Sequence, residues 1–465
     1  MFNFNNFIHY LPEVVIVFSI LLQIFCSVFN FKRISTSMTA AGLALSLYFL
    51  ISAQVWPTEL YSFLFKIMIL ISSLLILFLK TKRVFVKYSG HFNTLYLFSV
   101  LFLLMIADST NYLSLYLNIE LFSLCMYFLF SMDKKAVTLA ESYKYLVLSV
   151  TASAFILSGA AFLYGLTGTF YFQGISEFIN TASNYSFSTY VIPFFFIITG
   201  LCFKLGVFPF GNWIIDVYKN VDTKVAAFIS TAPKLAIFSV LVKILGSMIT
   251  FESSFILILF ALFTAGFGVI YGLRSNNLKE IMAASSYINI SYLLIALALY
   301  TKLSIATMLF YWAAYVFMNI GAFAGIISLE HSNQYSKEMD FRGYFYKNPL
   351  FSICFAVCII GLLGFPITSG FIAKIYLLSG VLNSGIIILP VILFMILLMV
   401  VSVCFYLSVI KKMFESIPYE NMNVIKCRTS NSIVLYICTF MTICLGALPA
   451  GLIKMCEYIS LYIFA

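Results

Sequence analysis

Long apolar runs separated by short polar breaks dominate the 465-residue sequence. The runs are about 20 residues long, which is the length an α-helix needs to cross the hydrocarbon core of a bilayer. Candidate spans begin near residues 11, 37, 60, 92, 111, 141, 189, 224, 253, 279, 304, 349, 388 and 430. The short alternating strands typical of a transmembrane β-barrel are not seen in this pattern. The sequence therefore predicts an all-α, polytopic membrane protein of about fourteen transmembrane helices.

Composition agrees with a protein that lies in lipid. Hydrophobic residues make up 63% of the chain and charged residues 9%, against about 45–50% and about 25% in soluble proteins. The net charge of +10 does not indicate nucleic-acid binding, because the basic residues are spread along the loops. The ten cysteines lie mostly in apolar runs without CxxC spacing, which favours small buried side chains over metal ligands. The three histidines, His9, His91 and His331, predict no metal cluster.

Basic residues also predict the orientation of the helices. Connections after odd-numbered spans hold 20 of the 27 Lys and Arg residues, whereas connections after even-numbered spans hold Lys302 alone. By the positive-inside rule the odd-numbered loops face the cytoplasm or matrix, so an even helix count places both termini on the other side. The first span contains Glu13 and shows no signal-cleavage pattern, and we interpret it as a retained helix.

Five lysines fall inside apolar spans, together with one mid-span acid. A charge at this depth costs at least about 2.5–3.5 kcal/mol, so such residues usually pair, face a hydrated interior and mark an ion path. The lysines are Lys66, Lys204, Lys234, Lys243 and Lys374, and the acid is Glu120. A structural role is the alternative for each. Lys204 could cap backbone carbonyls that the helix break leaves free. Lys234 and Lys374 could extend their side chains to the membrane surface, and for Lys66 and Lys243 this extension to the surface is the favoured explanation.

Helix breaks are predicted beside two of the lysines. Pro209 follows Lys204 in KLGVFPF, and Pro366 and Gly370 precede Lys374 in GFPITSGFIAK. The breaks fall in spans seven and twelve, which are five spans apart. Because five is an odd number, a five-helix unit that is repeated once has the opposite orientation in the membrane the second time. We therefore expect helices 1–3 in residues 1–91, two antiporter-like halves in 92–250 (helices 4–8) and 251–412 (helices 9–13), and a loop with helix 14 in 413–465.

Several stretches resemble the antiporter-like subunits of respiratory complex I, NADH:quinone oxidoreductase. They are ESYKYLVLSVTASAFILSGAAFLYGLTGTF, GLCFKLGVFPFGNWIIDVYKNVDTKVAAFISTAPKLAIF, LRSNNLKEIMAASSYINISYLLIAL, YVFMNIGAFA and GFPITSGFIAKIYLL. They occur in the family's order over residues of about 110 to 410. The resemblance is strongest to subunit 2, called subunit N in bacteria. Lys374 stands where subunit 4 is expected to carry glutamate, and the chain ends too early for the lateral helix of subunit 5.

The resemblance implies roles for four residues. Glu120 and Lys204 would form the charged pair of the first half-channel, Lys234 would link the halves, and Lys374 would be the terminal lysine from which protons leave. The sequence departs from many relatives at Asn289, where they carry histidine. A relay role there would fall to water or to neighbours such as Tyr292.

The function implied is proton translocation by a membrane-arm subunit, coupled to electron transfer from NADH to quinone elsewhere in the complex. No GxGxxG fingerprint or iron–sulfur cysteine pattern is seen, so NADH, FMN, iron–sulfur clusters and quinone would belong to partner subunits. The partners would be neighbouring membrane-arm subunits and lipid, in a bacterial or mitochondrial inner membrane. The alternatives are a subunit of a multisubunit cation/proton antiporter and the paralogous complex I subunit 4; a structural scaffold is disfavoured by the buried charges.

Overall fold

The computed structural model describes residues 10–29, 32–52, 60–81, 89–181, 187–332, 342–383, 388–416 and 429–464. Within these ranges the chain forms helices and no strands. A single antiparallel bridge between Asn111 and Tyr171 ties two interhelical turns together in the same part of the chain. His9 and the side chain of His331 lie outside the described residues.

Membrane-length helices account for most of the fold. Twelve helices in the described ranges are long and apolar enough to cross a bilayer. Two predicted spans, those near residues 189 and 349, correspond instead to shorter apolar helices at Tyr190–Leu205 and at Pro349–Leu363 with Ser369–Leu382. The prediction of an all-α, polytopic membrane protein is therefore confirmed.

The chain folds into two compact units. Unit 1 comprises Met1–Leu77, Arg83–Gly206 and Thr231–Ile256, and unit 2 comprises Phe78–Lys82, Val207–Ser230 and Leu257–Ala465. The helices that lie wholly or almost wholly in unit 1 are α2 (Leu11–Val28), α3 (Lys32–Ser52), α4 (Leu60–Phe78), α6 (Ser89–Asp108), α7 (Tyr112–Ser131), α8 (Ala136–Thr167), α9 (Phe172–Thr181) and α10 (Phe187–Leu205). Helices α12 (Thr223–Met248) and α13 (Phe251–Arg274) contribute residues to both units.

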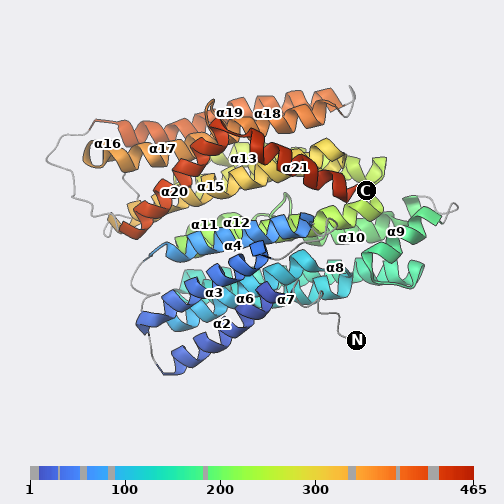
Figure 1. The fold of residues 1–465 in the computed structure, drawn as a ribbon. Coiled ribbons are helices and arrows are strands. Elements are labelled where there is room, and N and C mark those ends of the chain that lie inside the picture. Colours follow the sequence, from blue (N-terminus) through green and yellow to red (C-terminus); the bar gives the residue numbers. More distant parts are fainter. Residues whose placement is uncertain are drawn as a thin grey trace. The chain divides into compact units, whose positions relative to one another are not determined.

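In unit 1, neighbouring helices pack in sequence order. Helix α2 contacts α3 and α6, α6 contacts α7, α7 contacts α8, and α8 contacts α10 (Figure 1). Polar side chains join the first of these helices. Gln23 of α2 and Asn93 of α6 both donate hydrogen bonds to Ser35 of α3, at 2.5 and 2.8 Å. Such bonds, together with small residues, hold helices together in lipid, where no hydrophobic effect drives their association.

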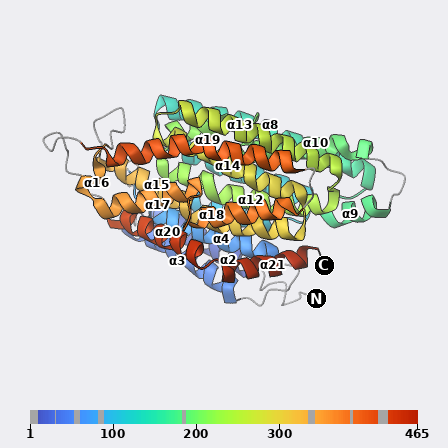
Figure 2. The same ribbon diagram turned by 90° about the horizontal axis from the view of Figure 1, so that it is seen from above.

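In unit 2, α15 is the central helix. The remaining helices of this unit are α11 (Trp213–Asn220), α14 (Leu278–Leu299), α15 (Lys302–Ser332), α16 (Tyr344–Lys347), α17 (Pro349–Leu363), α18 (Ser369–Leu382), α19 (Leu389–Phe414), α20 (Thr429–Ala447) and α21 (Ala450–Ile463). Helix α15 contacts α14, α17, α18, α20 and α21. Figure 2 shows α14, α15 and α18 close together, and α14 is buried along nearly its whole length.

Both predicted helix breaks are present. Helix α10 ends at Leu205, and α11 begins only at Trp213. Helix α17 ends at Leu363, and α18 begins at Ser369. Each first half ends at a glycine in the left-handed region, Gly206 with φ +76° and Gly364 with φ +85°. This conformation is strained for residues with a Cβ atom, and glycine adopts it without that cost.

Candidate functional site

Lys204 occupies the last turn of α10, immediately before the first helix break, and it is buried. Its Nζ donates hydrogen bonds to Ser123 Oγ of α7 at 2.9 Å and to Ser149 Oγ of α8 at 2.5 Å. A longer bond of 3.4 Å reaches the backbone carbonyl of Ser149. The ammonium group is therefore held at a junction of three helices mainly by hydroxyl groups, which can bind either a charged or a neutral lysine.

Glu120 lies on α7, one helical turn before Ser123, so the two side chains share a face of the helix. Its carboxylate acts electrostatically on Lys204. Both residues are described, and no ion pair joins them. The Oε1 atom of Glu120 is buried without a hydrogen-bond partner in the described part of the chain. The structure thus brings the predicted pair into one site, with Ser123 as the group that bonds to the lysine.

Lys234 lies near the middle of α12, directly after Pro233, and its side chain is buried with 1% exposure. It does not extend to a helix end, in contrast to a surface-seeking lysine. Lys243 is nine residues further along the same helix, a separation of about 14 Å. Its Nζ donates to the carbonyl oxygens of Ala107 at 2.6 Å and Ser109 at 3.4 Å. Lys243 therefore caps the end of α6, where the sequence favoured a lysine extending to the membrane surface.

Lys374 lies in α18, just after the second helix break, and is 2% exposed. Its Nζ donates to the backbone carbonyls of Leu362 at 3.0 Å and Leu363 at 2.7 Å, which end α17. The same nitrogen lies 5.4 Å from the ring centroid of Tyr292, within the range of a cation–π contact. The carbonyl-capping role weighed for Lys204 is thus seen most clearly at Lys374.

A buried polar network surrounds Asn289, the position that departs from histidine. Tyr311 donates to Asn289 Oδ1 at 2.7 Å, and Asn289 Nδ2 donates to Ser285 O at 2.8 Å and to Ser285 Oγ at 3.2 Å. Tyr406 donates to Ser285 Oγ at 2.6 Å. The ring of Tyr311 stacks against that of Tyr292, with centroids 6.4 Å apart. Hydroxyl and amide groups therefore reach from α19 to the aromatic ring beside Lys374.

For Lys66 the interpretation favoured by the sequence was wrong. The lysine does not extend to the membrane surface but is 5% exposed and forms ion pairs with Glu13 and Asp108. The Glu13 pair measures 2.8 Å between Nζ and Oε1. The three residues come from α4, α2 and α6, and they are far apart in sequence. No local pattern marks this cluster, and only the position of a lysine inside an apolar run indicated it.

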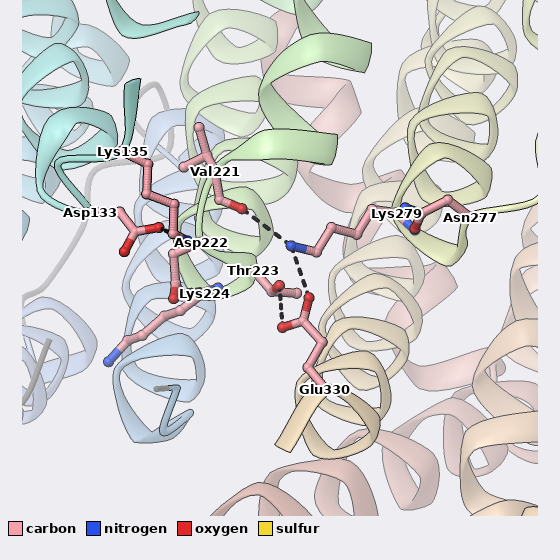
Figure 3. Close-up of polar contacts among 9 residues, drawn as sticks. All are labelled: Asp133, Lys135, Val221, Asp222, Thr223, Lys224, Asn277, Lys279 and Glu330. Carbon is pink, nitrogen blue, oxygen red and sulfur yellow. Dashed lines mark hydrogen bonds and ion pairs between the residues drawn. The ribbon is translucent and has the colours of Figure 1, made fainter. Parts of the chain in front are cut away.

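A second cluster joins helix ends in unit 2. Lys279, near the start of α14, forms an ion pair with Glu330 Oε1 of α15 at 2.9 Å, and Thr223 donates to Glu330 Oε2 at 2.6 Å (Figure 3). Lys279 also donates to the carbonyl oxygen of Val221 at 3.3 Å. Lys279 is one of the 20 basic residues that the sequence assigns to connections after odd-numbered spans, where lysines are ordinarily solvated. Its burial at 8% exposure became visible only in the fold.

Asp222 adjoins this cluster, in the turn between α11 and α12. Burial raises the pKa of its carboxyl group to about 6, and the nearby Glu330 carboxylate adds to that effect. A hydrogen bond of 2.9 Å from the backbone N–H of Lys224 to Asp222 Oδ1 opposes it, as do the charges of Lys279 and Lys224. Asp222 is thus a carboxyl group outside the membrane spans whose pKa is raised to about 6.

In the described ranges the potential metal ligands are scattered, and the cysteines are mostly buried. No group of three or more His, Cys, Asp or Glu side chains there is arranged to hold a metal ion. The nine cysteines of the described ranges are free thiols, and six of them are buried. Most cysteines are therefore the small buried side chains that the sequence predicted.

Comparisons with known proteins agree with the geometry. The family model described as NADH:quinone oxidoreductase/Mrp antiporter, TM, matches residues 109–405. The subunit N of NADH-quinone oxidoreductase from Trichlorobacter lovleyi is 30% identical over 374 residues, which cover 79% of this chain and 76% of that protein. A chain of respiratory complex I from Thermus thermophilus has a TM-score of 0.80 at 23% identity, covering 96% of this chain and 99% of that one. A chain of the Mrp complex from Dietzia sp. has a TM-score of 0.83 at 17% identity, covering 97% of each.

The two structural likenesses establish the fold alone, since complexes of two kinds share it. The family match covers the breaks and all four predicted site residues, and the Trichlorobacter relative extends the likeness over most of the chain. The chain belongs to the NADH:quinone oxidoreductase/Mrp antiporter transmembrane family and, within it, to the subunit N family of NADH-quinone oxidoreductases.

Proposed function

We propose that this chain is a proton-translocating membrane-arm subunit of respiratory complex I, NADH:quinone oxidoreductase. The observation that carries the proposal is Lys204, a buried lysine at a helix break, bonded to two serine hydroxyls within electrostatic reach of Glu120. Burial disfavours the charged lysine and the carboxylate favours it. A modest change in their separation therefore alters which protonation state is the more stable.

The proton-transfer step uses this balance. When Glu120 approaches Lys204, the ammonium form is stabilised and a proton is held; when it withdraws, the proton is released toward Lys234. The serine hydroxyls of Ser123 and Ser149 keep the nitrogen in place in both states. Moving one elementary charge against 100 mV costs about 2.3 kcal/mol, so the proton movement must be driven by coupled redox chemistry in other subunits or by an ion gradient.

Lys234 and Lys374 continue the path. Lys234 links the two halves, and Lys374 holds the proton that leaves, with its charge stabilised by the carbonyls of Leu362 and Leu363. The network around Asn289 and Tyr292 takes the place of the histidine relay of many relatives. A hydroxyl group can both donate and accept a hydrogen bond, so these side chains suit proton passage with water.

The proposed architecture has fourteen spans. Ten of them form two inverted halves of five, in residues 92–250 and 251–412, three precede the halves in residues 1–91, and one follows in 413–465. The two helix breaks at corresponding places support it, because discontinuous helices mark ion sites in inverted-repeat transporters. NADH, FMN, iron–sulfur clusters and quinone would be bound by partner subunits, and this chain would bind neighbouring membrane-arm subunits in an inner membrane. The similarity to a bacterial relative favours the inner membrane of a bacterium.

Substitution of the charged pair tests the proposal. Lys204→Ala or Glu120→Ala in the assembled complex should abolish or strongly reduce NADH-driven proton pumping, because the site loses its proton carrier or the charge that controls it. Pumping is measured as acidification of inverted membrane vesicles beside the rate of NADH oxidation. Lys302→Ala, at an exposed lysine that begins α15, is the matched control. Full pumping in both pair variants would refute the assignment.

The multisubunit cation/proton antiporter is the second candidate, because the Dietzia Mrp chain shares the fold over 97% of this chain. Co-purification separates the two functions. A complex I subunit should purify with flavin-bearing and iron–sulfur partners, whereas an antiporter subunit should not. Paralogous subunit 4 is less well supported, since Lys374 stands in α18 where a glutamate is expected.

A further inference from the structure

Glu13, Lys66 and Asp108 form a buried cluster that the proposed path does not use. Lys66 binds both carboxylates, and all three residues lie in unit 1. The side chains differ in exposure: those of Lys66 and Glu13 are 6% and 7% exposed, whereas that of Asp108 is 24% exposed. The cluster therefore has a buried end and an accessible end.

A cavity of about 470 Å³ adjoins the accessible end. Glu13 and Asp108 line it, together with polar side chains of the α6–α7 turn and of α7, namely Ser109, Thr110, Asn111, Ser114 and Asn118. The volume has room for several water molecules, and the polar lining supplies the partners that such waters need. In the described part of the chain, Glu13 Oε2 is buried without a hydrogen-bond partner although its residue lines the cavity. The ion pair with Lys66 therefore uses Oε1 of Glu13 and leaves the second carboxylate oxygen out of it.

The loop charges place this cavity on one face of the membrane. It is lined by the start of α2 and by the turn after α6, which is an even-numbered connection. Connections of this kind carry few basic residues and lie opposite the cytoplasm or matrix under the positive-inside rule. Lys66 lies six residues into α4, about 9 Å along the helix from its start on the same face.

Other charged or titratable groups surround the cluster. Tyr10 lines the cavity. Lys243 of α12 binds the carbonyls of Ala107 and Ser109 on either side of Asp108. These two bonds hold the backbone on either side of Asp108 in place and bring a positive charge close to the cluster.

We propose that Glu13, Lys66 and Asp108 form a proton-exchange site, open to the outer aqueous face through this cavity. In the exchange, the Lys66 ammonium gives a proton to the Asp108 carboxylate, leaving a neutral amine and a carboxylic acid. Asp108 then gives that proton to cavity water, and Glu13 keeps the Lys66 nitrogen in place. This inference rests on the proposed proton translocation and adds a route between the first half of the protein and the outside.

The alternative is a purely structural ion-pair cluster that joins α2, α4 and α6. Lys66→Arg separates the two roles, because arginine keeps the positive charge and both ion pairs but does not release a proton. Lys66→Met is the matched variant that loses both. If the cluster exchanges protons, the Lys66→Arg complex assembles and oxidises NADH, while its pumping per NADH falls to the level of Lys204→Ala. If it only joins helices, Lys66→Arg pumps as the wild type does and Lys66→Met fails to assemble.

Infrared difference spectra of the purified complex test the site without pumping. A carboxyl signal from protonation of Asp108 during turnover is expected in the wild type and should be absent from Asp108→Asn. Identical spectra would overturn the exchange site. Failure of the proposed function gives a different result, since Lys204→Ala would then pump fully. Loss of pumping in Lys204→Ala with full pumping in Lys66→Arg overturns the present inference alone.

Labelling tests the face to which the cavity opens. Ser114→Cys places a thiol in the cavity lining. A membrane-impermeant maleimide should modify it in right-side-out vesicles and not in inverted ones, relative to the parent protein with its native cysteines. Modification only from the inner side, or from neither side, would overturn the outward opening.

Discussion

Replacing Gly364 with alanine should displace Lys374 without altering any charge. Gly364 has φ +85° and ψ 53°, so an alanine there adopts a left-handed conformation that costs about 1–2 kcal/mol. Its Cβ would also lie 2.8 Å from Lys374 Cδ and 3.3 Å from Nζ. Contacts that short force the lysine side chain away from the end of α17.

The size of the effect follows from the bonds that Lys374 makes. Its ammonium binds the carbonyls of Leu362 and Leu363 at 3.0 and 2.7 Å. A hydrogen bond to a charged group contributes about 1.5–3 kcal/mol, so losing one of the two and adding the backbone strain destabilises the native arrangement by about 2.5–5 kcal/mol. The lysine nitrogen would then bind the end of α17 through at most one of the two carbonyls.

NADH-driven acidification of inverted vesicles measures this prediction, with NADH oxidation recorded in the same sample. We expect Gly364→Ala to lower pumping as strongly as removal of the Lys374 side chain does. Gly165→Ala, in helix α8 with nothing within 4 Å of the added Cβ, is the matched control and should pump normally. Full pumping by Gly364→Ala would show that the contact between Lys374 and the end of α17 has no part in proton transfer.

Two further predictions concern the first half-channel and the loop cluster. The double change Ser123→Ala with Ser149→Ala removes both hydroxyls that bind Lys204 and should strongly reduce pumping. The control is Ser158→Ala, which removes a hydroxyl that bonds only to its own helix and should leave pumping unchanged. Equal pumping by the two variants would show that the hydroxyls do not position the lysine. Burial raises the pKa of Asp222 to about 6 in the folded protein, whereas the pKa of an aspartate in an unfolded chain is about 3.9. Between about pH 4 and about pH 6 the folded protein therefore binds more protons than the unfolded chain, and its stability falls as the pH rises through this range. Asp222→Asn should remove this part of the pH dependence, as measured by the thermal unfolding temperature at about pH 4.5 and about pH 7; an unchanged dependence would contradict the assignment.

The sequence predicted the helices well because apolar runs of membrane length require little tertiary information. Each predicted span has a helix in the structure, and the breaks beside Pro209 and Pro366 follow from local backbone chemistry. The division of the last span into α20 and α21 was not predicted. It occurs between Ala447 and Ala450, where Pro449 cannot continue the helix that precedes it.

The candidate site was predicted less completely, for a physical reason. A charge inside an apolar span is visible in the sequence, but its partner is not, because the partner comes from another helix. Lys66 was therefore assigned to the membrane surface when Glu13 and Asp108 bind it. The cluster of Lys279, Glu330 and Thr223 was missed in the same way, since its members lie at helix ends that resemble solvated loops.

The end of helix α17 gives Lys374 a counter-charge of an unusual kind. Aligned peptide units leave roughly half a negative charge at the C-terminus of a helix, and the Lys374 nitrogen binds two of the carbonyls that carry it. Lys66 relies on carboxylates, which a proton can neutralise, whereas a peptide dipole neither titrates nor leaves its place. The affinity of the second helix break for a positive charge is thus built into the backbone and does not depend on the protonation of a carboxylate.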